Sequence, residues 1–553
     1  MPRYPVAGGD VELGYEPLVG EVAARVAKVV AVDGPPAVPW DELLPALVAA
    51  LERAGLSVAL VDLRAFYRPW DEIERLTDDA RLAHDPVFAR LPAVRLGELL
   101  GPLPEPSTRG VTVVAGPGAA LVGHDLLWYA DMPKALALAR LRDGLVANLG
   151  QQGGEAGSER RLLYLDWPIL DDHAASIVGR LDRLIDASDV HEPRSLTGEA
   201  LCASLRALAG RPFRTRPTFL PGAWGGQWLR RELGIETDAA NLAWSYELIT
   251  PESGILLGDD RPVEVGFDLL LASQGDRVLG ASVRERFGRS FPIRFDYLDT
   301  LEGGHLSVQC HPRDAYAREV FGLDYTQHET YYVMATTPGA SVFLGLEGDA
   351  DLASFREDAE RAARDGVGFE PERYVRRHEA REHQLYLIPA GTVHASGAGN
   401  VVLEISATPY LYTLRFYDWL RRDLEGELRP VHVDHAFANL DPGRRGDALA
   451  ELVPEPRVLR AGPGWAELEL GRHPDLFFRV NRLELEDAIA DEMDGRFHVL
   501  NLVEGGAVQI ETDAGDVQRL SYAETVVIPA AVGRYEVRPL EGTACKLVKA
   551  FVA

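Results

Sequence analysis

Four side chains that could bind one metal ion stand in two stretches of the sequence. Gln309 and His311 are two residues apart, so on an extended strand their side chains leave the same face. Glu329 follows in the next alternating segment, and His394 lies in a later one. An amide oxygen, two imidazoles and a carboxylate suit a divalent ion, zinc first, with iron, manganese or cobalt as alternatives. The spacing matches no compact metal motif, and a strand histidine before a proline can also be a plain edge residue.

The elements around these residues read as short strands. From Leu242 onward, strand-like segments alternate with turn signals, which is typical of a β-sandwich or barrel. Pro338 and Gly339 supply one turn, and Gly391 permits a tight turn before His394. Residues 351–383 are charged and helix-prone, so we predict a helical insertion there.

A second copy of the strand pattern follows. Residues 497–510 and 524–529 repeat the strand, glycine turn and Ile-Pro-Ala pattern of the first copy. Counting from that pattern places Arg534 where the first copy has His394, and no Gln-x-His pair appears. We therefore expect the second copy to hold no metal.

The N-terminal third has a different rhythm. Apolar strand-like segments alternate with helix-like ones such as 41–54 and 134–149, which predicts a parallel sheet with helices on both faces, a doubly wound α/β fold. The predicted strands are 29–33, 57–63, 111–114, 126–130 and 162–165.

The first turn of this α/β part resembles the strand, loop and helix of uridine kinase-like P-loop kinases. Aligning Gly34 with the first glycine of the loop places Pro39, Trp40 and Asp41 at the second glycine, the lysine and the hydroxyl residue. Proline donates no amide, tryptophan supplies no cation, and Asp41 repels phosphate. We predict a degenerate domain that has lost phosphoryl transfer and serves as a structural platform or dimer surface, with a surviving nucleotide site as the alternative.

Composition narrows the class of protein. A formal charge of −28 and a pI near 4.9 argue against a nucleic-acid or anionic membrane partner. The three cysteines are far apart and imply no disulfide framework. We find no signal-peptide pattern and no apolar segment of transmembrane length, so we expect a cytoplasmic protein with a small-molecule ligand, with a monomer and a homo-oligomer both left open.

The 553 residues are too long for one ordinary domain. A proline-rich segment at 211–221 marks a boundary. We predict an α/β domain at 1–210, a metal-binding domain at 211–430 with the insertion, and a metal-free domain at 431–553.

Several sequence words of the second and third parts resemble class I mannose-6-phosphate isomerases, which are metal-dependent cupin enzymes. The words occur in the family's order over roughly residues 212–553: PGAWGGQWLRRELGI, FPIRFDYLD, LSVQCHP, HETYYV, LIPAGTVHA, VVLEIS and YTLRFYDWLRR. The resemblance implies two cupin domains, one metal site per chain and a sugar or sugar phosphate as ligand.

The resemblance also assigns roles to single residues. It makes Gln309, His311, Glu329 and His394 the metal ligands. Arg415 falls on an active-site arginine, Ser307 on a position associated with substrate phosphate, and Glu404 on a strand near the pocket. Gln327 stands where the family carries a lysine implicated in substrate handling or proton transfer, and Arg294 stands where a lysine is common. His328 could replace that lysine, although adjacent strand residues face opposite ways.

Two functional hypotheses follow. The first is a metal-dependent isomerase that interconverts an aldose and a ketose, mannose 6-phosphate and fructose 6-phosphate or a related sugar, by proton transfer through an enediolate. The alternative is a non-catalytic or regulatory sugar-binding cupin joined to an inactive kinase-like domain. The complete metal set favours the enzyme, and Gln327 leaves the sugar open.

Overall fold

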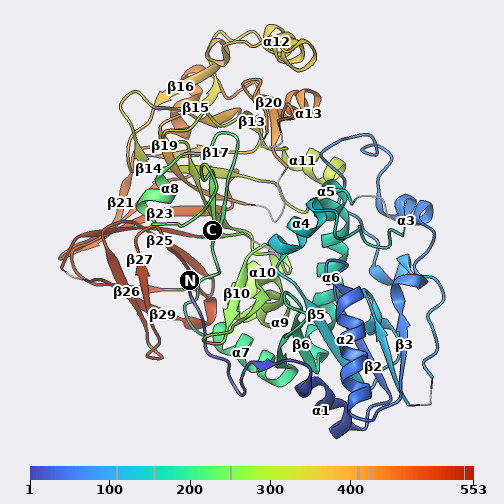
Figure 1. The fold of residues 1–553 in the computed structure, drawn as a ribbon. Helices are drawn as coiled ribbons and strands as arrows, with labels where there is room; N and C mark the ends of the chain where they lie inside the picture. The colour runs from blue at the N-terminus through green and yellow to red at the C-terminus, as the bar shows by residue number, and fades with distance from the viewer. Residues whose placement is uncertain (108–109, 153–156, 250–251, 408–411, 424–425, 541) are drawn as a thin grey trace. The chain divides into compact units, whose positions relative to one another are not determined.

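The structure is a computed structural model that describes residues 1–107, 110–152, 157–249, 252–407, 412–423, 426–540 and 542–553. It divides into two compact units (Figure 1). The first comprises Met1–Ala209 and Gly254–Gly275, and the second comprises Gly210–Ser253 and Asp276–Ala553. The three-domain division stays a prediction, with one difference: residues 254–275, placed in the metal-binding domain, belong to the first unit.

A hairpin explains this difference. Strands β10 (Gly254–Leu257) and β11 (Val263–Gly266) pair with each other and then lead into helix α9 (Phe267–Leu279). The backbone amide of Tyr4 donates to Leu256, and Arg194 donates to the carbonyl of Pro262 at 2.7 Å. Hydrogen bonds to the N-terminal part therefore hold the hairpin in the first unit.

The first unit is built on a seven-stranded sheet of order β1-β7-β6-β5-β2-β4-β3. Strands β2 to β6 are parallel, and β7 and β1 pair antiparallel at one edge. The strands are β1 (Glu12–Leu13), β2 (Val29–Asp33), β3 (Val58–Asp62), β4 (Val111–Ala115), β5 (Leu126–Asp131), β6 (Arg183–Asp186) and β7 (Arg194–Thr197). The helices include α1 (Glu16–Arg25), α2 (Trp40–Arg53), α4 (Lys134–Arg142), α6 (Trp167–Ile177) and α7 (Gly198–Leu208).

This sheet confirms the predicted α/β rhythm, but one predicted strand is wrong and one parallel strand was missed. The predicted strand at 162–165 is wrong, because Leu162–Asp166 is a helical turn that continues into α6. A short apolar segment fits a buried helix as well as a strand, so its pattern could not separate the two. The parallel strand that periodicity missed is β6, whose buried Arg183 breaks the apolar pattern.

The second unit contains two antiparallel sandwiches in sequence order. The first sandwich consists of a six-stranded sheet, β17-β14-β19-β12-β9-β8, and a five-stranded sheet, β16-β15-β18-β13-β20. Its strands are β8 (Thr218–Leu220), β9 (Trp244–Leu248), β12 (Arg294–Asp299), β13 (Val308–Cys310), β14 (Glu329–Thr336), β15 (Ser341–Leu346), β16 (Val375–Glu379), β17 (Leu385–Ile388), β18 (His394–Ser396), β19 (Asn400–Ser406) and β20 (Leu414–Tyr417).

Helix α12 (Leu352–Asp365) lies in the predicted helical insertion, and Asp351 caps its first turn. The second half of that insertion differs from the prediction, because it has only a short 3-10 turn (Pro371–Arg373) before edge strand β16. The charged side chains of β16 face solvent in alternation, which is typical of an edge strand and gave the segment its helix-like composition.

The second sandwich repeats the strand order of the first, except that its smaller sheet has no counterpart of β20. Its larger sheet runs β21-β22-β23-β30-β25-β28 and its smaller sheet β24-β29-β26-β27. Its strands are β21 (Arg457–Gly462), β22 (Trp465–Gly471), β23 (Phe478–Leu485), β24 (Ile489–Glu492), β25 (His498–Glu504), β26 (Ala507–Thr512), β27 (Val517–Ser521), β28 (Thr525–Ile528), β29 (Arg534–Pro539) and β30 (Cys545–Val552). Leucine, isoleucine and valine side chains from both sheets fill one core between them.

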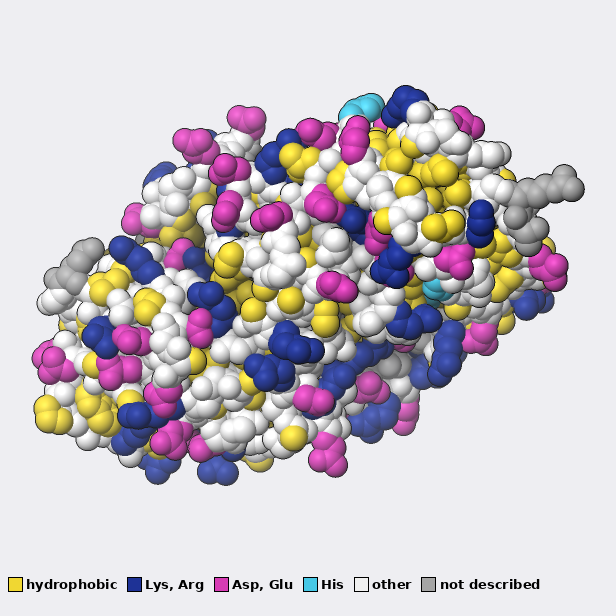
Figure 2. All heavy atoms as spheres, turned by 90° about the horizontal axis from the view of Figure 1, so that it is seen from below, with side chains coloured by type: hydrophobic (Ala, Val, Ile, Leu, Met, Phe, Trp, Pro, Cys, Tyr) yellow, Lys and Arg dark blue, Asp and Glu magenta, His cyan; other side chains and the backbone are white. Residues whose placement is uncertain are grey.

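On the face drawn in Figure 2, acidic and basic side chains are interspersed. No helix among the described residues is long and apolar enough to cross a membrane.

Candidate metal centre

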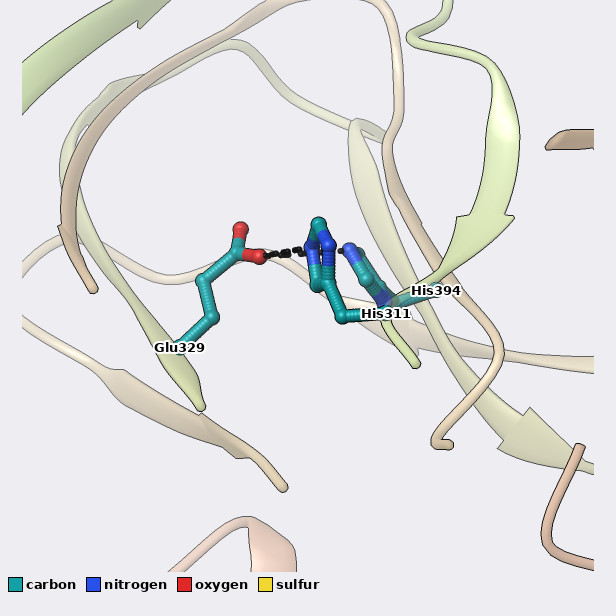
Figure 3. Close-up of side chains that lie close together, drawn as sticks. All are labelled: His311, Glu329 and His394. Carbon is teal, nitrogen blue, oxygen red and sulfur yellow. Dashed lines mark hydrogen bonds and ion pairs between the residues drawn. The ribbon is translucent and has the colours of Figure 1, made fainter. Parts of the chain in front are cut away.

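His311, Glu329 and His394 converge inside the first sandwich. His311 Nε2 lies 2.5 Å from Glu329 Oε2, and His394 Nε2 lies 3.6 Å from the same oxygen. The side chains are at most 1% exposed. Figure 3 shows the carboxylate pointing at the two imidazoles, whose ring centroids are 5.2 Å apart. Three ligand atoms within 4.8 Å of one another could bind one ion.

Both sheets contribute to this cluster. Glu329 is the first residue of β14 in the larger sheet, and His394 is the first residue of β18 in the smaller one. His311 follows β13, and its carbonyl accepts the amide of Gly391, a glycine with φ of 86° in the turn before His394. The three side chains therefore lie at strand ends that meet in space, and Gly391 lies in the predicted turn before His394.

Backbone carbonyls fix how the two rings present their nitrogens. His311 Nδ1 lies 3.3 Å from the carbonyl oxygen of Tyr412, and His394 Nδ1 lies 2.9 Å from that of Thr392. A carbonyl can only accept, so each Nδ1 carries the proton and each Nε2 presents its lone pair toward Glu329. This is the tautomer that a metal-binding histidine needs.

The chemistry of the cluster fits a cation. Burial lowers the pKa of His311 to about 4 and also lowers the pKa of His394, so both rings are neutral at pH 7. Glu329 is fully buried, and its Oε1 has no hydrogen-bond partner among the described residues. A buried carboxylate oxygen without a partner is costly, and a bound divalent ion would compensate it.

Gln309 lies beside the cluster, with its amide nitrogen toward His394 and its amide oxygen toward Ser307. It is directly opposite His394 in the β-ladder, and its Nε2 is 3.4 Å from His394 Nε2. Ser307 Oγ donates to Gln309 Oε1 at 2.7 Å. A half-turn of the amide would direct Oε1 toward the ion and leave Ser307 bonded to the amide nitrogen. Ser307 thus holds the amide in place.

Glu404 belongs to a buried polar network on the larger sheet. Arg294 Nη2 donates to Glu404 Oε1 at 2.9 Å, and Ser406 Oγ donates to the same oxygen at 2.8 Å. Burial and the Glu329 carboxylate raise the pKa of Glu404. The register places Arg294, Ser406 and Glu329 in one row and Asp296, Glu404 and Tyr331 in the next, all on one face. Periodicity could have found Asp296, which alternates with Arg294, but we did not single it out.

Arg415 lies at the edge of the site. It pairs with Gln309 on β13 and β20, so its side chain leaves the face that carries Gln309 and His394. Its guanidinium donates to the carbonyl of Pro430 at 3.1 Å and is partly exposed. A cation on this face could meet an anionic substrate group.

Gln327 and His328 point in different directions, as strand alternation predicts. Gln327 Nε2 is 3.5 Å from Glu329 Oε2, and its buried Oε1 has no hydrogen-bond partner among the described residues. His328 instead accepts the backbone amide of Ala390 at 3.2 Å. Gln327 therefore faces the candidate metal and His328 faces away from it.

Parts of the chain are similar to known proteins. Residues 14–210 match the model of a domain of unknown function, DUF8485. The mannose-6-phosphate isomerase of Streptococcus mutans is 27% identical over 230 residues, which are 41% of this chain and 66%, just under two thirds, of the relative. ManA of Bacillus subtilis is 23% identical over 61% of this chain and 98% of its own length. The probable mannose-6-phosphate isomerase GmuF of the same species is 30% identical over 240 residues, 41% of this chain and 67% of its own.

Among solved structures, the mannose 6-phosphate isomerase from Bacillus subtilis aligns with a TM-score of 0.49 and 19% identity over 62% of this chain and 99% of that one. The first sandwich, two antiparallel sheets around a buried His-Glu-His cluster, defines a β-sandwich protein with one candidate metal site. Within that class, the chain belongs to the mannose-6-phosphate isomerase family, a family of aldose–ketose isomerases.

Proposed function

We propose that this protein is a metal-dependent isomerase that interconverts mannose 6-phosphate and fructose 6-phosphate, or a related aldose and ketose. The observation that carries the proposal is the buried cluster of His311, Glu329 and His394, with one carboxylate oxygen left without a partner. Two neutral imidazoles and a carboxylate from strand ends of both sheets form an incomplete ligand shell. Such a shell leaves positions for substrate oxygens.

Zinc is the ion we propose. His311, Glu329 and His394 would hold it, joined by Gln309 once its amide oxygen is turned inward. A bound ion would supply a Lewis acid for substrate oxygens.

The chain's own residues then divide the remaining work. Glu404, a buried carboxyl whose pKa is raised, is our proposed proton-transfer group, and Arg294 holds its orientation. Arg415 and Ser307 would position the substrate, with Arg415 at the partly exposed edge suited to a phosphate. Gln327 can hydrogen-bond the substrate through its buried amide, but it carries no charge.

We further propose that the first unit is a degenerate kinase-like domain that acts as a platform. Support comes from Asp33 at the end of β2, whose carboxylate accepts the amides of Gly34, Gly118 and Ala120. His173 Nε2 lies 2.8 Å from the same carboxylate. An internal anion therefore uses the backbone donors at the strand end where a nucleotide phosphate would bind.

Exchange of the C2 proton tests the isomerase directly. Protein loaded with zinc is incubated in D₂O with mannose 6-phosphate, fructose 6-phosphate and the free hexoses, and deuterium incorporation at C2 is followed by NMR. We expect exchange with at least one of these sugars and none with His394→Ala.

The regulatory sugar-binding alternative predicts a different pattern. Gln327 favours this alternative, because a neutral amide replaces the family's lysine beside Glu329. Sugars that raise the melting temperature without any C2 exchange, in protein that has bound metal, would select the alternative and reject the isomerase.

A further inference from the structure

The second sandwich holds a cavity at the place where the first sandwich holds its metal cluster. In the smaller sheets, Gln309 lies opposite His394, and Glu492 lies opposite Arg534, each histidine or arginine being the first residue of its strand. Because the strand orders of the two sandwiches match, Glu492 corresponds to Gln309 and Arg534 to His394.

The larger sheets give the same correspondence. Glu329 lies opposite Ile388 at the end of β17, and His498 lies opposite Ile528 at the end of β28. His498 therefore occupies the position of Glu329. Two residues further along these strands, Glu404 lies opposite Tyr331, and Lys549 lies opposite Leu500, so Lys549 occupies the position of Glu404. Asp494, two residues after Glu492, corresponds to His311.

These corresponding residues line an open cavity of about 560 Å³. That volume is in the range of small-molecule sites. The lining includes Glu492, Asp494, His498, Arg534 and Lys549, which are the counterparts of the first sandwich's site residues. The position is thus retained as a hollow while its ligand set is replaced.

The floor of the cavity is a buried ion network. Lys549 Nζ lies 2.6 Å from both Glu467 and Asp491, and all three residues are at most 7% exposed. Arg460 contacts the same two carboxylates at 2.6 and 2.7 Å. Tyr535 donates to Asp491 at 3.1 Å. Two cations and two anions hold one another in place, so the floor presents fixed donors and acceptors with no net charge.

The rim repeats this balance. Its basic residues are Arg496 and Arg534, and its acidic residues are Glu492 and Asp494. His498 is neutral, because burial lowers its pKa to about 3. The rings of His498 and Phe551 add apolar wall. A strongly charged ligand would meet as much repulsion as attraction here, whereas hydroxyl groups, which both donate and accept, match the alternating groups.

We propose that this cavity is a second ligand site, which binds a small uncharged polyhydroxylated molecule such as a monosaccharide. It lies in the C-terminal sandwich (the orange-red part of the chain in Figure 1) and needs no metal. The site is separate from the proposed isomerase centre.

Filling the cavity tests the proposal. Ala490 lines it from β24, so Ala490→Trp should occupy the space and leave the ion network intact. Ala514→Trp, at an exposed position between β26 and β27, is the matched control. Binding of D-mannose, D-glucose, D-fructose and myo-inositol to the full chain is measured by calorimetry in the His394→Ala background, which disables the metal centre. Parallel titrations use mannose 6-phosphate.

We expect saturable binding of at least one uncharged probe, weakened at least ~tenfold by Ala490→Trp and unchanged by Ala514→Trp. Isomerase activity of Ala490→Trp with an intact metal centre reports that the variant folds, as does its melting temperature. The proposal is overturned if no uncharged probe binds, if binding survives Ala490→Trp, or if mannose 6-phosphate is the preferred ligand of this cavity. Failure of the isomerase proposal would appear separately, as absent C2 exchange with unchanged calorimetry.

Discussion

The two sandwiches of the second unit share a strand order, apart from β20, and differ in the side chains at corresponding positions, three of which form the candidate metal cluster of the first sandwich. The first has His311, Glu329 and His394, and the second has Asp494, His498 and Arg534. One backbone pattern thus carries a cluster suited to a cation in one copy and a mixed-charge cavity in the other. The shared fold therefore determines where these side chains lie, and the side chains themselves determine the chemistry of each site.

The buried carboxylates of the two sandwiches make the contrast sharper. Glu329 has one oxygen without a hydrogen-bond partner among the described residues, so this carboxylate is suited to bind a cation. Glu467 and Asp491 are already paired with two cations, Lys549 and Arg460. The buried carboxylate of the first sandwich is therefore able to bind a cation, whereas those of the second sandwich are already paired with cations of the chain.

The largest expected effect is loss of activity when a ligand position of the first sandwich is emptied. His394→Ala removes one of three converging ligand atoms, so we expect isomerase kcat/KM to fall by at least ~10³-fold, or about 4 kcal/mol of transition-state stabilisation. Arg534→Ala, at the corresponding position of the second sandwich, is the control and should leave kcat/KM unchanged. Equal losses of kcat/KM in the two variants would contradict the assignment of the isomerase site to the first sandwich alone.

The next effect is on stability and belongs to the second sandwich. Lys549→Met leaves the buried Glu467 and Asp491 with Arg460 as the one remaining cation of the network, which should lower the free energy of unfolding by ~3 kcal/mol. Lys546→Met, whose ion pair with Glu504 is partly exposed, should cost at most ~1 kcal/mol. Denaturant unfolding measures both, and a Lys549 variant as stable as the Lys546 variant would show that Lys549 does not compensate these carboxylates.

A smaller effect concerns pH. His498 has a pKa of about 3 in the folded state and 6.5 as its ordinary value, so between these values the unfolded chain binds the proton that the folded chain excludes. The unfolding free energy should therefore rise with pH across this window, by up to ~1.4 kcal/mol per pH unit from this residue, and level off above it.

His498→Gln should remove that share of the pH slope, and the exposed control His84→Gln should not. Thermal unfolding of the three proteins between pH 5 and 8 supplies the curves. Parallel curves for wild type and His498→Gln would mean that the residue is not buried as a neutral ring.

The smallest effect concerns the hydrogen bond from Ser307 to Gln309, a proposed metal ligand. Ser307→Ala removes the hydroxyl that holds the Gln309 amide at 2.7 Å, and we expect kcat/KM to fall ~10-fold. Ser521→Ala on β27 of the second sandwich is the control. An unchanged kcat/KM for Ser307→Ala would remove Gln309 from the ligand set.

The sequence predicted some of these features better than others. Strand alternation was enough to predict that Gln327 and His328 point in different directions. The Ile-Pro-Ala repeat was enough to place Arg534 at the position that corresponds to His394. The sequence could not show that Lys549 replaces Glu404, because that correspondence depends on strand pairing between distant segments. Residues 254–275 were predicted within the second domain, whereas the structure groups them with the first unit, because the partners of hairpin β10–β11 lie far away in sequence.

Metal content per chain tests the central claim most directly. Purified wild type, Glu329→Gln and Arg534→Ala are loaded with zinc, freed of excess ion and measured by mass spectrometry of the metal. We predict about one ion per chain in wild type and Arg534→Ala and essentially none in Glu329→Gln. Retention of the ion by Glu329→Gln, or its loss from Arg534→Ala, would contradict a single metal centre in the first sandwich.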